Sequence, residues 1–277
     1  MRVIARLQDP RYCQIVVLSL LVVFGVFVLN FDIRWQNALT IVVSALVAQY
    51  IASNFIGEIK FDPLSPMITS LSLTLLLRTE ATELAMLAAA IAIGSKFLLR
   101  VRGKHVFNPA NVALVALSLL SDRAWVSSGQ WGSAAIGAFA LACLGFIVLT
   151  RAKRAETTLA FLSAFAILLL GRALWLNDPL SIPLHQLQNG TLLIFAFFMI
   201  SDPKTTPDSR IGRVTYGMLV ASIAYAIQYI FYEPTGPILA LIISAPFVPL
   251  IDAIFRGQIY RWKRAITKPD GQVEGAY

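Results

Sequence analysis

The sequence predicts an all-α integral membrane protein that forms one polytopic domain over residues 1–277. Apolar runs repeat from one end of the chain to the other, the mean hydropathy is +0.72, and only 14% of the residues are charged. These values are typical of a chain that crosses a bilayer many times. The longest polar pieces are the N-terminal end, a loop near residue 205 and the tail after Arg256. Each is too small to form a soluble core, so we expect no separate soluble domain.

Ten apolar segments divide the chain. They cover residues 14–30, 38–55, 64–77, 84–99, 110–121, 132–150, 157–175, 190–200, 214–232 and 236–255. The first follows three arginines but is long and lacks a small-residue cleavage site, so we interpret it as a retained span rather than a signal peptide. Several others are shorter than the ~20 residues that a straight helix needs to cross the hydrocarbon core. We therefore expect about ten transmembrane segments, some of them short, broken helices.

The distribution of basic residues predicts ten crossings with both termini in the cytoplasm. If every segment crosses and the N-terminus is inside, 19 of the 23 Lys and Arg residues fall on the inside. Cytoplasmic loops carry such an excess, and removing any one segment would invert the rest of the chain and spoil the distribution. The net charge of +8 is then explained by topology and by anionic lipid, so the bilayer is the expected partner and nucleic acid is not.

Ten crossings divide into two halves of five, and an odd number per half forces the halves into opposite orientations. We place these inverted repeats at about 12–125 and 130–256, with a cytoplasmic tail at 257–277. The third and eighth segments agree with this division, because both are short and border an Asp-Pro pair, at Asp62-Pro63 and Asp202-Pro203. Proline-marked helix starts are common in membrane bundles, so the repeat depends mainly on the number of crossings.

The polar stretch from Ser201 to Arg213 is the candidate site. It contains five charged residues and two prolines between an apolar run and a long apolar segment. An ordinary solvated loop is the common alternative. However, Asp202-Pro203 and Thr206-Pro207 rigidify the stretch, and the apolar run before it is too short for a comfortable crossing. This combination is typical of a broken helix that lines an internal site.

No hydrolase or metal-binding pattern is visible in the sequence. His105 and His185, the only histidines, fall on opposite sides of the predicted membrane topology, and neither has the spacing of a metal ligand. We expect Asp252, near the inner end of the last segment, to cap the helix or pair with Arg256.

Several motifs occur in an order and spacing that resemble a known family. They are Phe107-Asn108-Pro109-Ala110-Asn111 after Lys104-His105, His185 to Gly190, Phe197 to Pro203, Thr206-Pro207, Gly212-Arg213 with Tyr216-Gly217, and Val248 to Asp252. The chain resembles the membrane subunits shared by the Rnf electron transport complex, as its D subunit, and the sodium-pumping NADH:quinone reductase, as its B subunit. The resemblance extends over nearly the whole chain and is strongest from His185 to Asp252.

The resemblance implies a ten-helix fold of two inverted five-helix halves, similar to urea and ammonium channels, in the inner membrane of a bacterium. It also implies FMN or riboflavin, which such subunits carry as one-electron relays, and other redox subunits or a flavoprotein as partners. Polar side chains near the broken helices suit the edge of the flavin ring, and basic ones suit a phosphate or a reduced ring. We expect the cofactor at Asn108, Asn111, Ser201, Asp202, Thr205, Thr206 and Arg213.

The sequence departs from the family where FMN is normally attached. The family resemblance implies a phosphoester to a Thr at the outer start of the sixth helix, and here that position falls on Ala134, with Ser133 one residue early. A methyl group offers no oxygen, and one step along a helix turns a side chain by about 100°. We therefore expect non-covalent flavin. The chain is also shorter than most complex-bound members, which suggests a stand-alone paralogue such as those of natural-product gene clusters.

Two functions follow from this sequence. The first is a membrane subunit that binds flavin and relays electrons across or within the membrane, with ion transport as a coupled process. The second is a channel or carrier for a small polar solute between the two repeats, without a redox role. The missing acceptor Thr adds weight to the second function.

Overall fold

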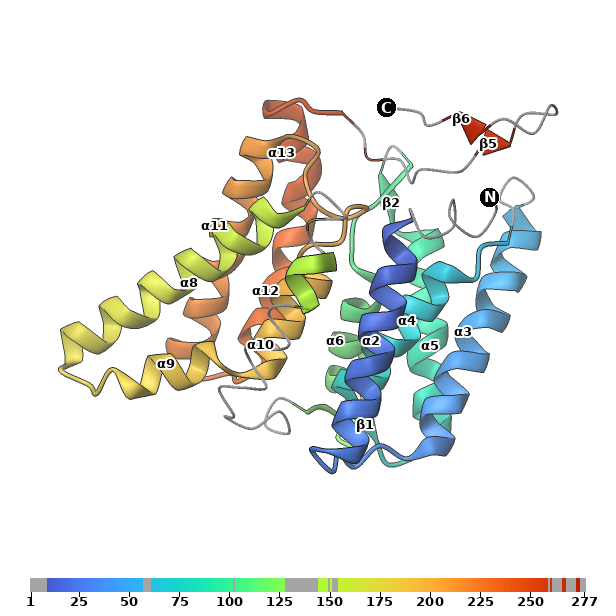
Figure 1. Ribbon diagram of the computed structural model, residues 1–277, viewed down its shortest axis with the longest axis horizontal. Helices are drawn as coiled ribbons and strands as arrows, with labels where there is room; N and C mark the ends of the chain where they lie inside the picture. The colour runs from blue at the N-terminus through green and yellow to red at the C-terminus, as the bar shows by residue number, and fades with distance from the viewer. Residues whose placement is uncertain are drawn as a thin grey trace.

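The computed structural model describes residues 9–56, 61–101, 103–127, 144–148, 150, 154–258, 260, 266–267 and 273–274. This part of the chain is mostly helical, as predicted (Figure 1). Four helical stretches in it are long and apolar enough to cross a membrane: Pro10–Phe27, Trp35–Phe55, Ala155–Leu176 and Gly236–Ile254. Large apolar side chains such as Trp35, Phe55 and Trp175 lie exposed on them. The protein is therefore a helical membrane protein.

The first group of helices occupies one side of the molecule in Figure 1. It comprises α2 (Pro10–Phe27), α3 (Trp35–Ile56), α4 (Leu64–Leu76), α5 (Thr82–Leu98) and α6 (Pro109–Leu120). Helix starts follow local rules, because the Asn108 side chain accepts the Asn111 amide and Pro109 occupies the first turn of α6. Two short antiparallel pairs complete the group: β1 (Leu77–Thr79) with β4 (Ala124–Val126), and β2 (Arg100–Val101) with β3 (Lys104–His105).

The second group lies on the other side of the molecule (Figure 1). It comprises α8 (Ala155–Leu176), α9 (Ser181–Leu187), α10 (Gly190–Ile194), α11 (Arg210–Tyr229), α12 (Gly236–Ser244) and α13 (Val248–Ile254). α10 continues as a π-helical turn, Phe195–Met199, and a 3₁₀ turn, Ala245–Phe247, joins α12 to α13. A further strand pair, β5 (Ile266–Thr267) with β6 (Val273–Glu274), follows near the C-terminus.

Nine of the ten predicted apolar segments coincide with these helices. The sixth, residues 132–150, lies largely outside the described residues, of which only 144–148 and 150 fall within it. α4 and α6 have 13 and 12 residues, which at 1.5 Å per residue gives about 20 Å, less than the ~30 Å of a hydrocarbon core. The prediction of short helices is thus confirmed, whereas ten complete crossings stay a prediction.

The two groups share one buried core. Buried apolar side chains of α4, α6, α8, α11 and α12 belong to a single continuous cluster. A polar contact also joins the groups, because Asn111 Nδ2 on α6 donates to the Ile238 carbonyl on α12 at 3.0 Å. Positions in the two groups are therefore held relative to one another by packing rather than by a flexible linker.

Helices α8 and α11 approach one another closely at Gly217. A Cβ placed there would lie 2.7 Å from the Thr157 carbonyl oxygen and 3.0 Å from the Phe161 amide nitrogen, both of them backbone atoms. We expect Gly217→Ala to destabilise the protein by about 1–3 kcal/mol, the usual range for overpacking. Thermal unfolding of the detergent-purified protein measures this. Gly171→Ala on α8 is the matched control, because its Cβ would meet nothing within 4 Å, and equal losses in both variants would contradict the close contact.

Candidate functional site

A polar cavity of about 250 Å³ lies where the short helices α4 and α6 and the π-helical turn meet the ends of α2, α3 and α5. Its charged and polar lining includes Arg11, Asp62, Lys96, Asn108, Ser201 and Asp202. Charged side chains inside a membrane protein are costly and mark functional sites by default. We call this space the polar cavity.

The structure brings three of the seven predicted site residues together in the polar cavity: Asn108, Ser201 and Asp202. The Asn108 amide donates to Asp202 Oδ2 at 3.5 Å and to the Met199 carbonyl at 3.4 Å. Ser201 Oγ donates to the Phe197 carbonyl at 2.6 Å. The start of α6 and the end of the π-helical turn, far apart in sequence, therefore meet at one side of the cavity.

Asp202 organises the loop that follows the π-helical turn. Its Oδ1 accepts the Lys204 amide at 2.9 Å, and its backbone carbonyl accepts the amides of Thr205 and Thr206, each at 3.1 Å. The Thr206 hydroxyl donates to the same carbonyl at 3.0 Å. Burial raises the pKa of the Asp202 carboxyl, and the bonded Lys204 amide only partly opposes this effect. Thr205 and Thr206 thus stabilise the loop through the Asp202 carbonyl, and neither lines the polar cavity.

The remaining predicted residues serve contacts elsewhere. Arg213 Nη1 donates to the Asp208 carbonyl at 2.8 Å, and its Nε lies 3.4 Å from Glu156 Oε2 at the start of α8. Asn111 is almost fully buried and connects α6 to α12. The placement of both residues indicates a role in holding helices together.

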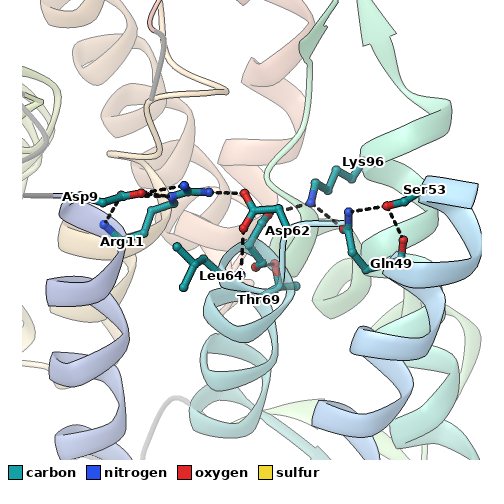
Figure 2. A network of polar contacts seen from close by, with 9 residues as sticks. Asp9, Arg11, Gln49, Ser53, Asp62, Leu64, Thr69 and Lys96 are labelled. Carbon is teal, nitrogen blue, oxygen red and sulfur yellow. Dashed lines mark hydrogen bonds and ion pairs between the residues drawn. The ribbon is translucent and has the colours of Figure 1, made fainter. Parts of the chain in front are cut away.

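Figure 2 shows a second network, on the side of the polar cavity formed by α2 to α5. Arg11 forms ion pairs with Asp9, at 2.6 Å, and with Asp62. Asp62 Oδ1 also accepts the Leu64 amide at 3.1 Å, near the start of α4. Lys96 Nζ donates to Gln49 Oε1 and to Ser65 Oγ, both at 2.7 Å. This network joins four helices across the cavity.

Lys96 and Gln49 are not among the predicted site residues. Lys96 lies near the end of the predicted apolar segment 84–99, and the structure places it on α5, 8% exposed. Gln49 on α3 is also buried, at 2% exposed. A polar residue inside an apolar segment is the signal that identifies both, because such residues face the protein interior in membrane bundles.

The β2–β3 hairpin connects the first helix group to the second. Lys104 Nζ lies 3.0 Å from Asp208 Oδ1 and 2.9 Å from Asp252 Oδ2, and the Asp208 amide donates to Asp252 Oδ1 at 2.7 Å. We name these three residues the Lys104 latch. The prediction that Asp252 pairs with Arg256 is wrong. Among the described residues Asp252 forms its ion pair with Lys104, because the hairpin reaches the end of α13.

A second cavity of about 490 Å³ lies beside the hairpin, and His105 and Lys204 border both cavities. Burial, together with the positive charges of Lys96, Arg100 and Lys204, lowers the pKa of His105 to about 3. His105 is therefore neutral at pH 7 and adds no charge to either cavity.

The lining of the polar cavity suits a flat ring with a polar edge. Phe97, Phe197 and Phe198 supply aromatic surface, Lys96 supplies a hydrogen-bond donor, and the Asp202 carboxylate supplies an acceptor. This donor and acceptor set fits the carbonyl and imide groups of an isoalloxazine. Among the residues that the structure describes, no group of three His, Cys, Asp or Glu side chains could hold a metal ion.

The fold and the cavity define the class: a helical membrane protein with a charged internal site among short helices. Residues 118–261 match the NQR2, RnfD, RnfE family. Because this match covers more than half of the chain, the protein belongs to that family, and the resemblance noted in the sequence motifs is confirmed.

The chain is similar to ion-translocating oxidoreductase complex subunits D of several bacteria. The protein of Erwinia tasmaniensis is 30% identical over 118 residues, which cover 42% of this chain and 33% of the relative. That of Escherichia coli O1:K1 is 27% identical over 139 residues, which cover 50% of this chain and 35% of the relative. The chain thus matches about a third of the length of these relatives.

Proposed function

We propose that this chain is a flavin-binding membrane subunit that relays electrons within a larger redox complex. The observation that carries the proposal is the polar cavity, where aromatic walls and a charged, hydrogen-bonding edge meet among short helices. The relatives are named as subunits of an ion-translocating oxidoreductase complex, which supports redox partners in the bacterial inner membrane and coupling to ion transport.

The residues of the polar cavity have distinct tasks in this proposal. Asp202 would accept the imide N–H of the ring, Lys96 would donate to a ring carbonyl oxygen, and Asn108 would hold the Asp202 carboxylate in place. A bound flavin accepts and releases single electrons, which is the chemistry that a relay needs. The cavity volume of about 250 Å³ lies just below the usual range of small-molecule sites, about 300–1,000 Å³, and this small size favours FMN or riboflavin over a dinucleotide.

The cofactor is proposed to be non-covalent. Ala134 and Ser133, on which this expectation depends, lie outside the described residues. Purified protein should show the visible absorption of oxidised flavin, and a denaturing gel under ultraviolet light should show no fluorescent band. A fluorescent band that disappears in Ser133→Ala would instead establish covalent attachment.

A channel or carrier for a small polar solute is the second candidate. Ser65, Thr69 and Ser72 of α4 line the polar cavity, and such a row of hydroxyls suits a hydrated solute. Colourless purified protein that increases the flux of a small polar solute into liposomes would support this function and contradict the flavin proposal.

We also propose that the two helix groups are inverted repeats with ten crossings. The packing supports this proposal, because α3 packs on α5 as α8 packs on α11, and α5 packs on α6 as α11 packs on α12. β1 and β4 join the segments that follow α4 and α6. In the second group, Gly257 after α13 lies against Asp208 and Ser209 in the loop before α11, which is the corresponding connection.

Opposite ends of the second group should face opposite sides of the membrane. The Arg210 side chain is 80% exposed at the start of α11, and Asp178 is 35% exposed beyond the end of α8. In a variant without Cys13 and Cys143, a cysteine at Arg210 should react only with reagents that reach the cytoplasm, and one at Asp178 should react from outside. Equal labelling of both positions from outside would exclude the proposed topology.

A further inference from the structure

Among the residues that the structure describes, Lys96 is a buried cation with no carboxylate within 4.0 Å of its Nζ. The described side chains that accept from Nζ, Gln49 through Oε1 and Ser65 through Oγ, are both neutral. An ammonium group has three N–H donors, so one remains for the polar cavity. A buried charge without a counter-ion is costly. The described side chains therefore leave the positive charge of Lys96 unbalanced at the cavity wall.

The neighbours of Lys96 hold it in place without neutralising it. Ser53 Oγ donates to the backbone carbonyl of Gln49 at 2.7 Å, and the Gln49 side-chain amide donates back to Ser53 Oγ at 3.3 Å (Figure 2). This arrangement turns Gln49 Oε1 toward Lys96. Asp62, the nearest acid in the network, forms its ion pair with Arg11. Lys96 is thus oriented by neutral groups while the carboxylate beside it is engaged elsewhere.

Among the described charged groups at the polar cavity, cations outnumber carboxylates. The cations in its lining are Arg11, Lys96, Arg100 and Lys204, the carboxylates in its lining are Asp62 and Asp202, and a third carboxylate, Asp9, pairs with Arg11 beside it. His105 is neutral at pH 7 because its pKa lies at about 3. A ligand with a negative charge would complete this balance, and the contact with Lys96 would be a charge-assisted hydrogen bond, roughly twice as strong as a neutral one.

We propose that the polar cavity binds its ligand as an anion and that Lys96 supplies the counter-charge. This inference rests on the proposed function and names the form of flavin that the site prefers: the reduced ring. Two electrons from a partner redox protein and one proton convert the neutral oxidised ring into a reduced ring with one negative charge, and no bond to the protein forms or breaks. Because Lys96 stabilises only the charged form, the site favours reduction.

The test compares redox titrations of the purified, flavin-loaded protein. In Lys96→Met, binding of the reduced relative to the oxidised flavin should fall about ten- to a hundredfold, as expected for a hydrogen bond to a charged group. For a two-electron couple this lowers the midpoint potential by about 30–60 mV. Lys96→Arg should retain most of the wild-type potential. Arg210→Met, which removes one exposed cation outside the cavity, should leave the potential unchanged.

The outcomes separate the two proposals. If Lys96→Met binds flavin and the bound flavin keeps the wild-type midpoint potential, the anion inference is overturned and the proposed function stands. Wild-type protein that binds no flavin would overturn both. If Lys96→Met fails to fold, the wild-type protein still decides the matter, since tighter binding of the reduced form must raise its melting temperature when excess riboflavin is reduced with dithionite. The effect of dithionite alone is subtracted by measuring the protein without flavin. Equal melting temperatures with oxidised and with reduced riboflavin would then overturn the inference.

Discussion

Lys104→Met is expected to lower the free energy of unfolding by about 3–5 kcal/mol, the usual cost of removing one partner from a buried ion pair. The side chains of Lys104, Asp208 and Asp252 are only 16%, 9% and 18% exposed. Without the ammonium group, two carboxylates would remain close together with little solvent to screen them. Thermal or denaturant unfolding in detergent measures the loss.

A more exposed ion pair provides the control for this result. Arg172 lies 3.2 Å from Asp178, with both side chains 35% exposed, and Arg172→Met should cost no more than about 1 kcal/mol. Adding Asp208→Asn to Lys104→Met should recover part of the loss, because it removes one of the two uncompensated charges. Equal losses from Lys104→Met and Arg172→Met would show that the Lys104 latch does not stabilise the fold.

Asp202→Ala is expected to reduce flavin affinity about ten- to a hundredfold, because it removes a charged hydrogen-bond acceptor from the polar cavity. The loss of stability should be smaller, about 1–2 kcal/mol, since the carboxylate also caps the Lys204 amide. Equilibrium dialysis with riboflavin, together with thermal unfolding, measures the two effects separately.

The conservative variant distinguishes the two tasks of this carboxylate. Asp202→Asn keeps an oxygen that can accept the Lys204 amide, so it should retain most of the stability while still losing affinity for the ring imide. Asp122→Ala, at an exposed turn after α6, is the matched control and should change neither quantity. Flavin affinity that is unchanged in Asp202→Ala would mean that the loop is only structural.

The sequence alone was sufficient for the helices and for the approximate place of the site. Helix formation depends on neighbouring residues, so apolar runs and proline-marked starts such as Asn108-Pro109 located nine described helical segments within a few residues. The same local signals identified the Asp202 loop, because charges and prolines are unusual beside a short apolar run. The motifs around this loop were also enough to recognise the family.

Only the tertiary structure decided which polar groups meet. Lys96 contacts Ser65 and Gln49 from other helices, and Lys104 reaches Asp252, 148 positions along the chain. A sequence does not reveal that the Thr206 hydroxyl donates to the Asp202 carbonyl, or that Lys96, near the end of an apolar segment, lines the polar cavity. Such contacts depend on how helices pack and turn about their axes, and local composition leaves that rotation undetermined because many packings satisfy the same apolar pattern.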